Sequence, residues 1–489
     1  MPQVIGVDVG SQSVKAVCLD DSGTVVRAAS APLSMLHRHN GWAEQRPLDW
    51  VAQLGAVVGE ITAPGDLDVR MIALACQVDG VVPVDHRLRP LRDALIWLDR
   101  RAELQTDAFV RQTSLVEIFT QTGLNADASH CAPKMMWIRE HDPDTWAATR
   151  YLLPVTAYLV GWLTGTVAQD PANASSTMLY DLSSGDYSDS LCALAGVPRE
   201  FLPPIAKAAE VCGTVNRDAA LLLGLSEECE VLVGTGDEHA ASIAAGACKE
   251  GIICDVTGTA EPVTTAASGL HLDPDRLVET HAHAVDGLYL VENPGFVSGG
   301  STLWLADNIL GVKQGAVFEL AANAPVGSDG VTFVPALTGS MTPRWNAGLR
   351  AAFNGLSMNH TRSNLARAVL EGCAFALRDI VERISDLGLG GDEVRIVGGG
   401  GRSQLWNQIK ADVLGRPVRR VLSPDGTALG VASLAAVSAG FFPSLEAATD
   451  IVIELGKSQI EPDAKRHARY ESAYHDYRRL FDGIEGASR

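Results

Sequence analysis

Two aspartates stand where a predicted strand gives way to small residues, and they are the first candidates for chemistry. Asp8 ends the buried-strand run 4–8 and precedes a turn at residues 10–13, Gly-Ser-Gln-Ser. Glycine lets backbone N–H groups face an anion, serine hydroxyls add donors, and Lys15 lies on the next strand. The pattern favours a site for phosphate and metal, but a hairpin in which Asp8 only stabilises the turn has the same pattern.

Asp237 is the second aspartate. A strand is predicted over residues 230–234 and a turn over 235–237, followed by a helix made mostly of Ala, Ser and Gly. Small residues let a ligand approach the backbone closely, which favours a carboxylate acting as general base. A helix N-cap is the commonest role of such an aspartate, and on the residues alone the two interpretations are evenly balanced.

A run of four glycines at 398–401 is the third candidate. It follows a strand predicted over 394–397 and precedes a helix over 403–414. A strand–glycine–helix arrangement can lie against a nucleotide, because helix N-termini attract anions; a flexible connection is the alternative. Neither GxGxxG in an N-terminal βαβ unit nor GxxxxGK[ST] is present. The three candidates together supply a metal holder, phosphate donors and a base, which phosphoryl transfer requires.

The elements that must position these residues form an internal repeat. Segments 5–11 and 252–259 each combine a strand ending in an acid, a glycine beside a hydroxyl, and a second strand. This repeat predicts an α/β protein of two related domains, 1–246 and 247–489, each presenting a hairpin to a shared cleft. An N-terminal meander is predicted at 4–8, 14–19 and 24–28, and helices at 49–61, 363–387, 426–438 and 464–481.

Bulk composition limits the class of protein. A chain of 489 residues with 46% hydrophobic content is too long for one core, so at least two domains are expected. A net charge of −20 argues against a nucleic-acid partner. No apolar run is long enough to span a bilayer and the N-terminus does not resemble a signal peptide, so no membrane partner and a cytoplasmic location are expected.

Cysteine and histidine spacing gives no metal motif. The nine cysteines are scattered without a CxxC pair, and the twelve histidines show no HExxH or comparable spacing. The cysteines are therefore interpreted as reduced, buried hydrophobes. A zinc site would require distant residues to converge, and nothing in the sequence argues for one.

Several segments resemble the FGGY carbohydrate kinases and, within that family, the xylulose kinases most closely. The similarity covers nearly the whole chain, and its most specific block is residues 398–417, from the four glycines to Gly-Arg-Pro. The other segments that carry it are 7–15, 41–47, 94–99, 132–134, 236–237, 257–259 and 366–372.

The resemblance implies two ribonuclease-H-like domains of the actin-like ATPase type around a central cleft that holds ATP and sugar. It implies that Asp237 is the general base and that Asp8 and Asp237 lie at Mg²⁺. The implied nucleotide and phosphate contacts are Ser11, Gln12, Lys15, Gly258, Thr259, Gly299, Gly400 and Gln404. The implied reaction is ATP-dependent phosphorylation of a pentulose such as xylulose. Related kinases are often dimers, so a homodimer is a further expectation.

Departures from the xylulose kinase pattern concern the sugar. Residues 77–80 are Gln-Val-Asp-Gly instead of the usual Gln-Met-His-Gly, and Glu238 stands where Asn is usual. Glycerol kinases carry an acid at the position of Asp79, and a carboxylate can accept two polyol hydrogen bonds. Val78, Asp79 and Glu238 are therefore candidate substrate-binding residues, and another ketose or polyol (ribulose, a pentitol, erythritol or glycerol) stays open.

Two other classes of protein remain as alternatives. One is an actin-like or chaperone-like ATPase switch without a sugar substrate, although that class lacks the sugar-site segments 41–47 and 77–80. The other is a sensor that binds sugar without turnover, against which the presence of both Asp8 and Asp237 argues.

Overall fold

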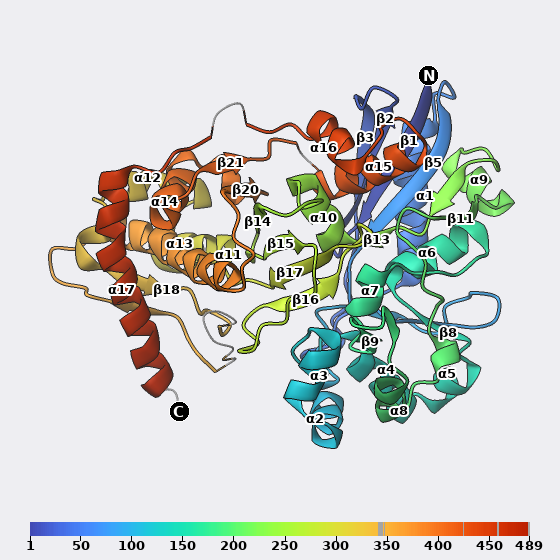
Figure 1. Ribbon diagram of the computed structural model, residues 1–489, viewed down its shortest axis with the longest axis horizontal. Coiled ribbons are helices and arrows are strands. Elements are labelled where there is room, and N and C mark those ends of the chain that lie inside the picture. Colours follow the sequence, from blue (N-terminus) through green and yellow to red (C-terminus); the bar gives the residue numbers. More distant parts are fainter. Residues whose placement is uncertain (341–345, 347, 424, 457–458, 488–489) are drawn as a thin grey trace.

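The computed structural model describes residues 1–489 except 341–345, 347, 424, 457–458 and 488–489. Two α/β halves lie side by side along the long axis of the molecule (Figure 1). The N-terminal strands lie at one end, and the long C-terminal helix α17 (Ala464–Ala487) lies at the other. Each half is built around one mixed β-sheet. The predicted two-domain α/β fold is therefore confirmed.

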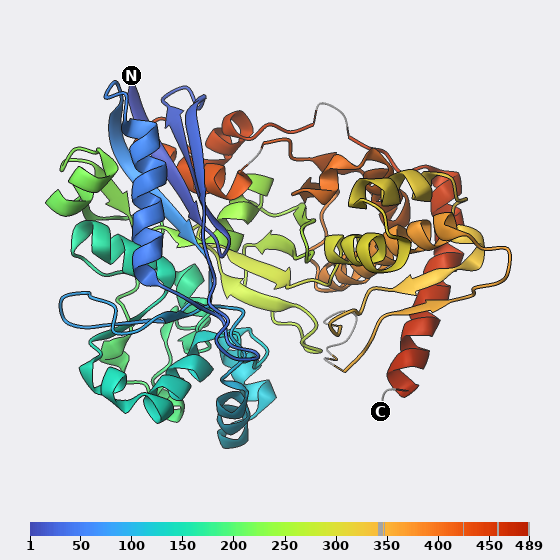
Figure 2. The same ribbon diagram turned by 180° about the vertical axis from the view of Figure 1, so that it is seen from behind.

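The N-terminal sheet has the strand order β11-β12-β5-β1-β2-β3, and β13 also pairs with β5. β1 is antiparallel to β2 and parallel to β5, which is parallel to β12 and β13. Helix α1 (Pro47–Thr62) covers its outer face (Figure 2) and buries Trp50 and Leu54 against it. The strands are β1 (Pro2–Val9), β2 (Ser13–Asp20), β3 (Val25–Pro32), β5 (Asp68–Cys76), β11 (Val211–Thr214), β12 (Glu230–Leu232) and β13 (Thr235–Gly236).

The C-terminal sheet repeats this plan in the order β16-β17-β15-β14-β20-β21. β14 is antiparallel to β15 and parallel to β20, as β1 is to β2 and β5. The repeat predicted from segments 5–11 and 252–259 is therefore a repeat of topology. The strands are β14 (Ile252–Val256), β15 (Val263–Ala267), β16 (Glu279–Ala282), β17 (Tyr289–Asn293), β20 (Glu393–Val397) and β21 (Val418–Arg420).

Two helices of small residues join the halves. α10 (Asp237–Ala245) packs against α15 (Gly426–Ser438), and α15 also packs on β1 and β5 (Figure 1). Ala240, Ala244, Ala428 and Ala432 are fully buried in this shared core. Short side chains let the two helices approach closely, so α15 from the C-terminal half rests on the N-terminal sheet. This packing fixes the start of α10, where Asp237 lies.

The remaining helices surround the two sheets. Those of the N-terminal half are α2 (Glu103–Gln112), α3 (Leu115–Thr122), α4 (Cys131–His141), α5 (Pro143–Ala148), α6 (Val155–Thr164), α7 (Pro171–Ser175), α8 (Asp189–Ala195) and α9 (Arg217–Leu223). Those of the C-terminal half are α11 (Gly299–Trp304), α12 (Gln314–Ala322), α13 (Arg362–Asp386), α14 (Gln404–Leu414) and α16 (Leu445–Val452). Within the described chain, no helix combines the length and the apolar character needed to cross a membrane.

The prediction for residues 230–237 was wrong in detail. The strand breaks after Leu232, resumes as β13, and Asp237 is the first helical residue instead of part of a turn. Gly234 causes the break: its φ is +74°, and a Cβ there would lie 2.3 Å from the carbonyl oxygen of Leu74. The third strand and the last helix also run further than predicted, to Pro32 and Ala487.

Candidate active site

Three parallel strand ends bring the predicted N-terminal residues to one edge of the sheet. Val9 of β1 and Gly236 of β13 both pair with Cys76, the last residue of β5. Asp8, the loop that follows β5, and Asp237 therefore lie together. Ligands of open α/β sheets bind outside the carboxyl ends of their strands, which is where these residues stand.

Asp8 and Asp237 form a half-buried acidic pair. Burial, followed by the charge of Asp237, raises the pKa of Asp8 to about 7, while Lys15 lowers it. Burial also raises the pKa of Asp237 to about 6, against the backbone N–H groups of Glu238 and Val78, which favour the carboxylate. The Glu238 N–H donates to Asp237 Oδ1 at 2.9 Å. Two desolvated carboxylates this close favour a shared cation.

The turn after β1 contains the other predicted phosphate contacts. Lys15 pairs with Asp8 across β1 and β2, and its Nζ lies 3.1 Å from Oδ1 of Asp425, the residue before α15. The Lys15 ammonium therefore links the N-terminal half to Asp425 of the C-terminal half, beside Asp8. The Gln45 side chain donates to the Ser11 carbonyl oxygen at 2.8 Å, which fixes the turn, and the Gln12 side chain is exposed.

Asp79, in the predicted sugar loop, is half of an ion pair. Its Oδ1 lies 3.3 Å from His130 Nδ1, and its backbone has a φ of +60°. Burial lowers the pKa of His130, but the Asp79 charge and hydrogen bond raise it to about 9 overall. Lys134 Nζ donates to the Asp79 carbonyl oxygen at 2.7 Å. Asp79 Oδ1 therefore faces an imidazolium, and Oδ2 takes no part in this ion pair.

Glycine-rich loops converge on the end of β14 in the C-terminal half. The backbone N–H groups of Gly299 and Gly400 donate to the carbonyl oxygens of Gly258 and Thr257, both at 3.1 Å. A Cβ on Gly299 would lie 2.3 Å from the Gly258 oxygen, so only glycine allows this approach. The Gly300 N–H donates to the Thr259 oxygen at 3.0 Å. The predicted nucleotide contacts in these loops thus come together, and the exposed Gln404 begins α14 nearby in sequence.

A buried lysine that sequence reasoning missed holds this loop region. Lys410 Nζ lies 2.6 Å from Asp255 Oδ2, 3.0 Å from Glu261 Oε1 and 2.6 Å from Thr257 Oγ1. Lys410 is 1% exposed, although its position in α14 is far from the other residues in sequence. One feature of the sequence indicated this role: Lys410 lies on the apolar face of the helix predicted over 403–414, inside the segment 398–417.

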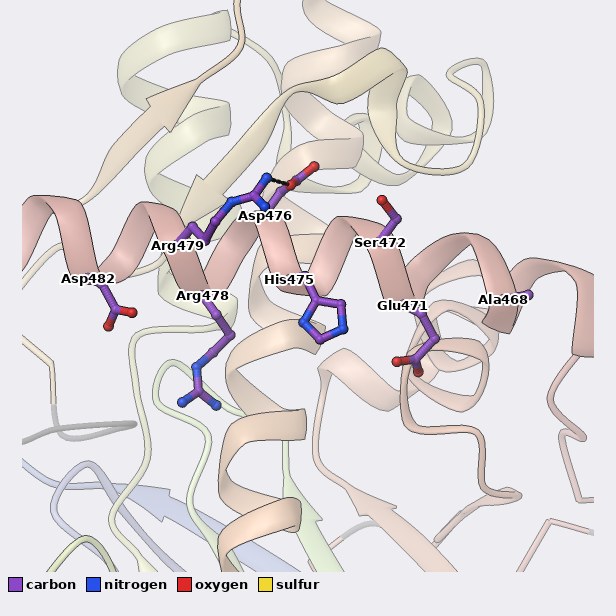
Figure 3. A pocket seen from close by; sticks show the side chains of 8 residues that line it. All are labelled: Ala468, Glu471, Ser472, His475, Asp476, Arg478, Arg479 and Asp482. Atoms are coloured by element: carbon purple, nitrogen blue, oxygen red, sulfur yellow. Dashed lines mark hydrogen bonds and ion pairs between the residues drawn. The ribbon is translucent and has the colours of Figure 1, made fainter.

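A surface hollow on α17 is separate from these residues. Figure 3 shows charged side chains along the exposed face of this helix, including the ion pair of Arg479 with Asp476. The hollow is lined by Ala468, Glu471, Ser472, His475, Asp476, Arg478, Arg479 and Asp482. Since all of them come from one helix, it is a shallow surface feature and does not belong to the candidate active site.

Comparison with protein families gives matches across both halves. Residues 3–244 match the family described as FGGY family of carbohydrate kinases, N-terminal domain. Residues 256–439 match the C-terminal domain of the same family.

Individual relatives match over nearly their full lengths. A xylulose kinase of Escherichia coli is 29% identical over 98% of this chain and 99% of its own. A glycerol kinase of Thermococcus onnurineus is 29% identical over 91% of this chain and 90% of its own. The crystal structure of xylulose kinase from Rhodospirillum rubrum superposes with a TM-score of 0.92, at 30% identity and 99% coverage of both chains.

Proposed function

The chain belongs to the FGGY family of carbohydrate kinases, and on that premise we propose that it transfers the γ-phosphoryl group of Mg-ATP to a hydroxyl of a small ketose or polyol. The pair Asp8 and Asp237 carries this proposal. Both side chains are half-buried at the carboxyl ends of neighbouring strands, and they lie close enough for Asp237 to raise the pKa of Asp8.

Each partner of the pair has a separate role in the proposal. Asp237 accepts the proton of the attacking hydroxyl, a role worth about 10²–10⁴-fold in rate. Asp8 and Asp237 fit Mg²⁺, because the ion prefers oxygen ligands and their carboxylates are desolvated and close together. When bound, the ion neutralises charge on the phosphates. Lys15 adds a second positive charge at the same edge.

Nucleotide binding is proposed for the glycine-rich loops of the C-terminal half. Gly258 and Thr259 would lie at the ATP phosphates, with Gly258 letting the nucleotide approach the backbone and Ser11 and Gln12 approaching from the other half. The nucleoside would lie towards Gly299, Gly400 and Gln404. The mutual hydrogen bonds of these loops support the assignment, because they hold several glycines in one place.

A pentulose such as xylulose is the first candidate for the substrate, since xylulose kinases are among the relatives that match the full length. The ion pair of Asp79 with His130 favours a second candidate. This is a substrate whose hydroxyl pattern differs from that of xylulose, such as another pentulose or a pentitol. Val78 and Glu238 both direct their backbone N–H groups at Asp237, and their side chains would line the same sugar site. A glycerol kinase is also among the relatives.

The experiment that tests this function is an ADP-release assay over xylulose, ribulose, erythritol, xylitol, arabinitol and glycerol, with a sugar-free control. We expect ADP release to depend on one or a few of these compounds and the product to be a sugar phosphate by mass spectrometry. Equal ADP release with and without every sugar would support an ATPase switch and contradict the proposal.

The proposed enzyme works in the cytoplasm, where ATP is available and thiols stay reduced. Eight of the nine cysteines are buried, and burial raises the pKa of thiols such as Cys18 to about 12, which keeps them unreactive. A homodimer stays a prediction, to be measured by light scattering of the purified protein.

A further inference from the structure

A buried group of imidazole and carboxylate side chains lies between α10 and the strands β16 and β17. Glu238 and His239 belong to the first turn of α10, and His281 belongs to β16. One ligand atom from each of these three side chains lies within 4.8 Å of the others. Glu279 of β16 and Glu292 of β17 form a second such group with the same His281.

The strand register explains why these side chains gather. Glu279 pairs directly with Glu292 across β16 and β17, and His281 lies two residues after Glu279. Side chains two apart on a strand, and directly opposed across strands, project from the same face of a sheet. His239 of α10 meets this face, since its ring centroid lies 5.8 Å from that of His281 in an edge-to-face contact.

Several polar atoms in this group have no hydrogen bond. His239 is 0% exposed and His281 is 3% exposed, and no described group forms a hydrogen bond with either ring nitrogen of either residue. Glu292 Oε2 is likewise buried without a hydrogen bond. The neighbouring carboxylate oxygens lie at 3.6 Å from His239 Nε2 (Glu238) and 3.4 Å from His281 Nε2 (Glu292). Since buried polar groups are normally hydrogen-bonded, the arrangement favours a ligand that accepts electron pairs from nitrogen and oxygen.

We propose that Glu238, His239 and His281 bind a divalent transition-metal cation of the Zn²⁺ class, with Glu292 as the adjacent carboxylate. Imidazole nitrogen combined with carboxylate oxygen is a donor set of Zn²⁺ and similar ions, whereas Mg²⁺ takes oxygen ligands. A single neutral hydroxyl would satisfy one or two of these atoms and leave the others without a hydrogen bond. The Glu238 side chain is 27% exposed, which gives the ion a route in.

Such a cation would link the two halves of the molecule. Glu238 and His239 directly follow Asp237 in α10, and His281 lies in the C-terminal sheet. A cation bound by all three would therefore anchor the first turn of α10, and with it Asp237, to β16. The site shares Glu238 with the proposed sugar site, but its other ligands, His239 and His281, are not part of the Asp8 and Asp237 pair assigned to Mg²⁺, and its occupancy can be measured without turnover.

The test is a Co²⁺ titration of the tag-free protein in millimolar Mg²⁺, followed by the visible d–d absorbance of the bound ion, with Zn²⁺ as competitor. We expect one equivalent of Co²⁺ to bind, Zn²⁺ to displace it, and the melting temperature to rise, because a ligand that binds only the folded state stabilises it. His239→Gln and His281→Gln should each weaken binding by more than about tenfold.

His283→Gln is the matched control. His283 is also buried and lies beside His239, at 6.1 Å between ring centroids, but its Nδ1 accepts a hydrogen bond from the Val285 N–H and it belongs to neither ligand group. This variant should bind Co²⁺ as the native protein does. Should circular dichroism show that the His239 and His281 variants are unfolded, Glu238→Gln, at a partly exposed position, supplies the same comparison.

Three results would overturn the proposal: no d–d absorbance at micromolar Co²⁺, absorbance unchanged in the ligand variants, or loss of binding in excess Mg²⁺. The last would place the ion at the Asp8 and Asp237 carboxylates. Because no result depends on turnover, failure of this proposal and failure of the kinase assignment are distinguishable.

Discussion

Asp8 is buried deeply enough for its pKa to rise to about 7, and after burial itself the charge of Asp237 contributes most to that rise. A cation in the same place would reverse the effect, because it stabilises both carboxylates in their charged form. At the scale of single residues, the predicted phosphate edge is therefore a place where Lys15 offsets the negative charge only in part. Lys15, whose charge lowers the pKa of Asp8, is shared with Asp425.

Asp8→Ala tests the metal role of this edge. Removing one of the two carboxylates should raise the Mg²⁺ concentration needed for half-maximal activity and lower kcat, since the ion keeps fewer protein ligands. The measurement is an Mg²⁺ titration of ADP release at saturating ATP. Asp21→Ala, an exposed acid in the β2–β3 turn, is the control and should leave the titration unchanged. An Asp8→Ala titration that matches the native one at full activity would rule out this role.

Asp79→Ala tests the choice of substrate. Loss of the carboxylate leaves the buried His130 without its partner and removes an acceptor for a sugar hydroxyl. We expect kcat/KM for the best substrate to fall tenfold or more and the ranking across the sugar panel to change, because sites built for hydrogen bonding discriminate strongly. A double-mutant cycle with His130→Gln should be non-additive. Unchanged ranking and efficiency, with D-xylulose best by a wide margin, would show that Asp79 has no part in selectivity.

Site residues could be predicted where neighbouring residues in the sequence form a recognisable pattern. Asp8 lies near the end of β1 and Asp237 directly follows β13, each near a glycine, so the pattern alone indicated them. His130, His281 and Lys410 gave no such indication, because their neighbours in space are distant in the chain. The group around His281 likewise has no local sequence motif, since it is assembled by strand register and helix packing.

At the scale of elements, regular patterns were predicted well and backbone exceptions were not. The helix predicted over 426–438 has those bounds as α15, and α13 begins and ends one residue from its prediction. α13 is amphipathic, whereas α15 is a run of small and apolar residues that is buried on all sides. The break before β13 depends on the carbonyl oxygen of Leu74 lying against Gly234, and no local property of residues 230–237 reveals that contact.

The packing of α17 on α13 contains a titratable group that should affect stability. Asp379 Oδ1 accepts hydrogen bonds from the Tyr474 hydroxyl at 2.6 Å and from Arg478 Nη1 at 2.7 Å, while Oδ2 is buried without one. Burial, partly offset by Arg478, raises the pKa of Asp379 from 3.8 to about 6. Between these two values the folded protein binds a proton that the unfolded chain releases. The stabilisation is therefore complete below the lower value and lost as pH rises through about 6.

Asp379→Asn should remove this pH dependence. Relative to the variant, the native protein should gain about 1 kcal/mol in its free energy of unfolding between pH 7 and pH 5. Urea unfolding of both proteins at the two pH values measures the difference. Asp386→Asn, at an exposed position on the same helix, is the control and should follow the native protein. Parallel pH dependence of the Asp379→Asn and native proteins would contradict the assignment.

At the scale of the whole molecule, the two sheets face a shared pair of helices. α10 carries Asp237 and packs on α15, and α15 rests on β1 and β5, so movement of one half relative to the other must involve this packing. Phosphoryl transfer benefits from exclusion of water, which two domains can provide by closing on their substrates. The contact of Lys15 with Asp425 lies at this junction, beside Asp8.

If the two halves close on their substrates, the molecule should become more compact and the binding of sugar and nucleotide should be coupled. The substrate sugar together with a non-hydrolysable ATP analogue should reduce the radius of gyration measured by small-angle scattering. The sugar should also tighten binding of the analogue measured by calorimetry, because each ligand stabilises the closed form that the other prefers. A compound from the panel that is not phosphorylated is the control. Identical scattering profiles with and without both ligands, and independent affinities, would argue for a rigid molecule.

The measurement that tests the central claim most directly is sugar-dependent phosphoryl transfer by Asp237→Asn, compared with the native protein and with Glu230→Gln, an exposed acid on β12. If Asp237 is the base of a sugar kinase, kcat should fall by about 10²–10⁴-fold in Asp237→Asn while affinity for the ATP analogue stays unchanged, and Glu230→Gln should behave as the native protein. A near-normal kcat in Asp237→Asn would contradict the account and leave this aspartate as the first residue of α10 without a catalytic role.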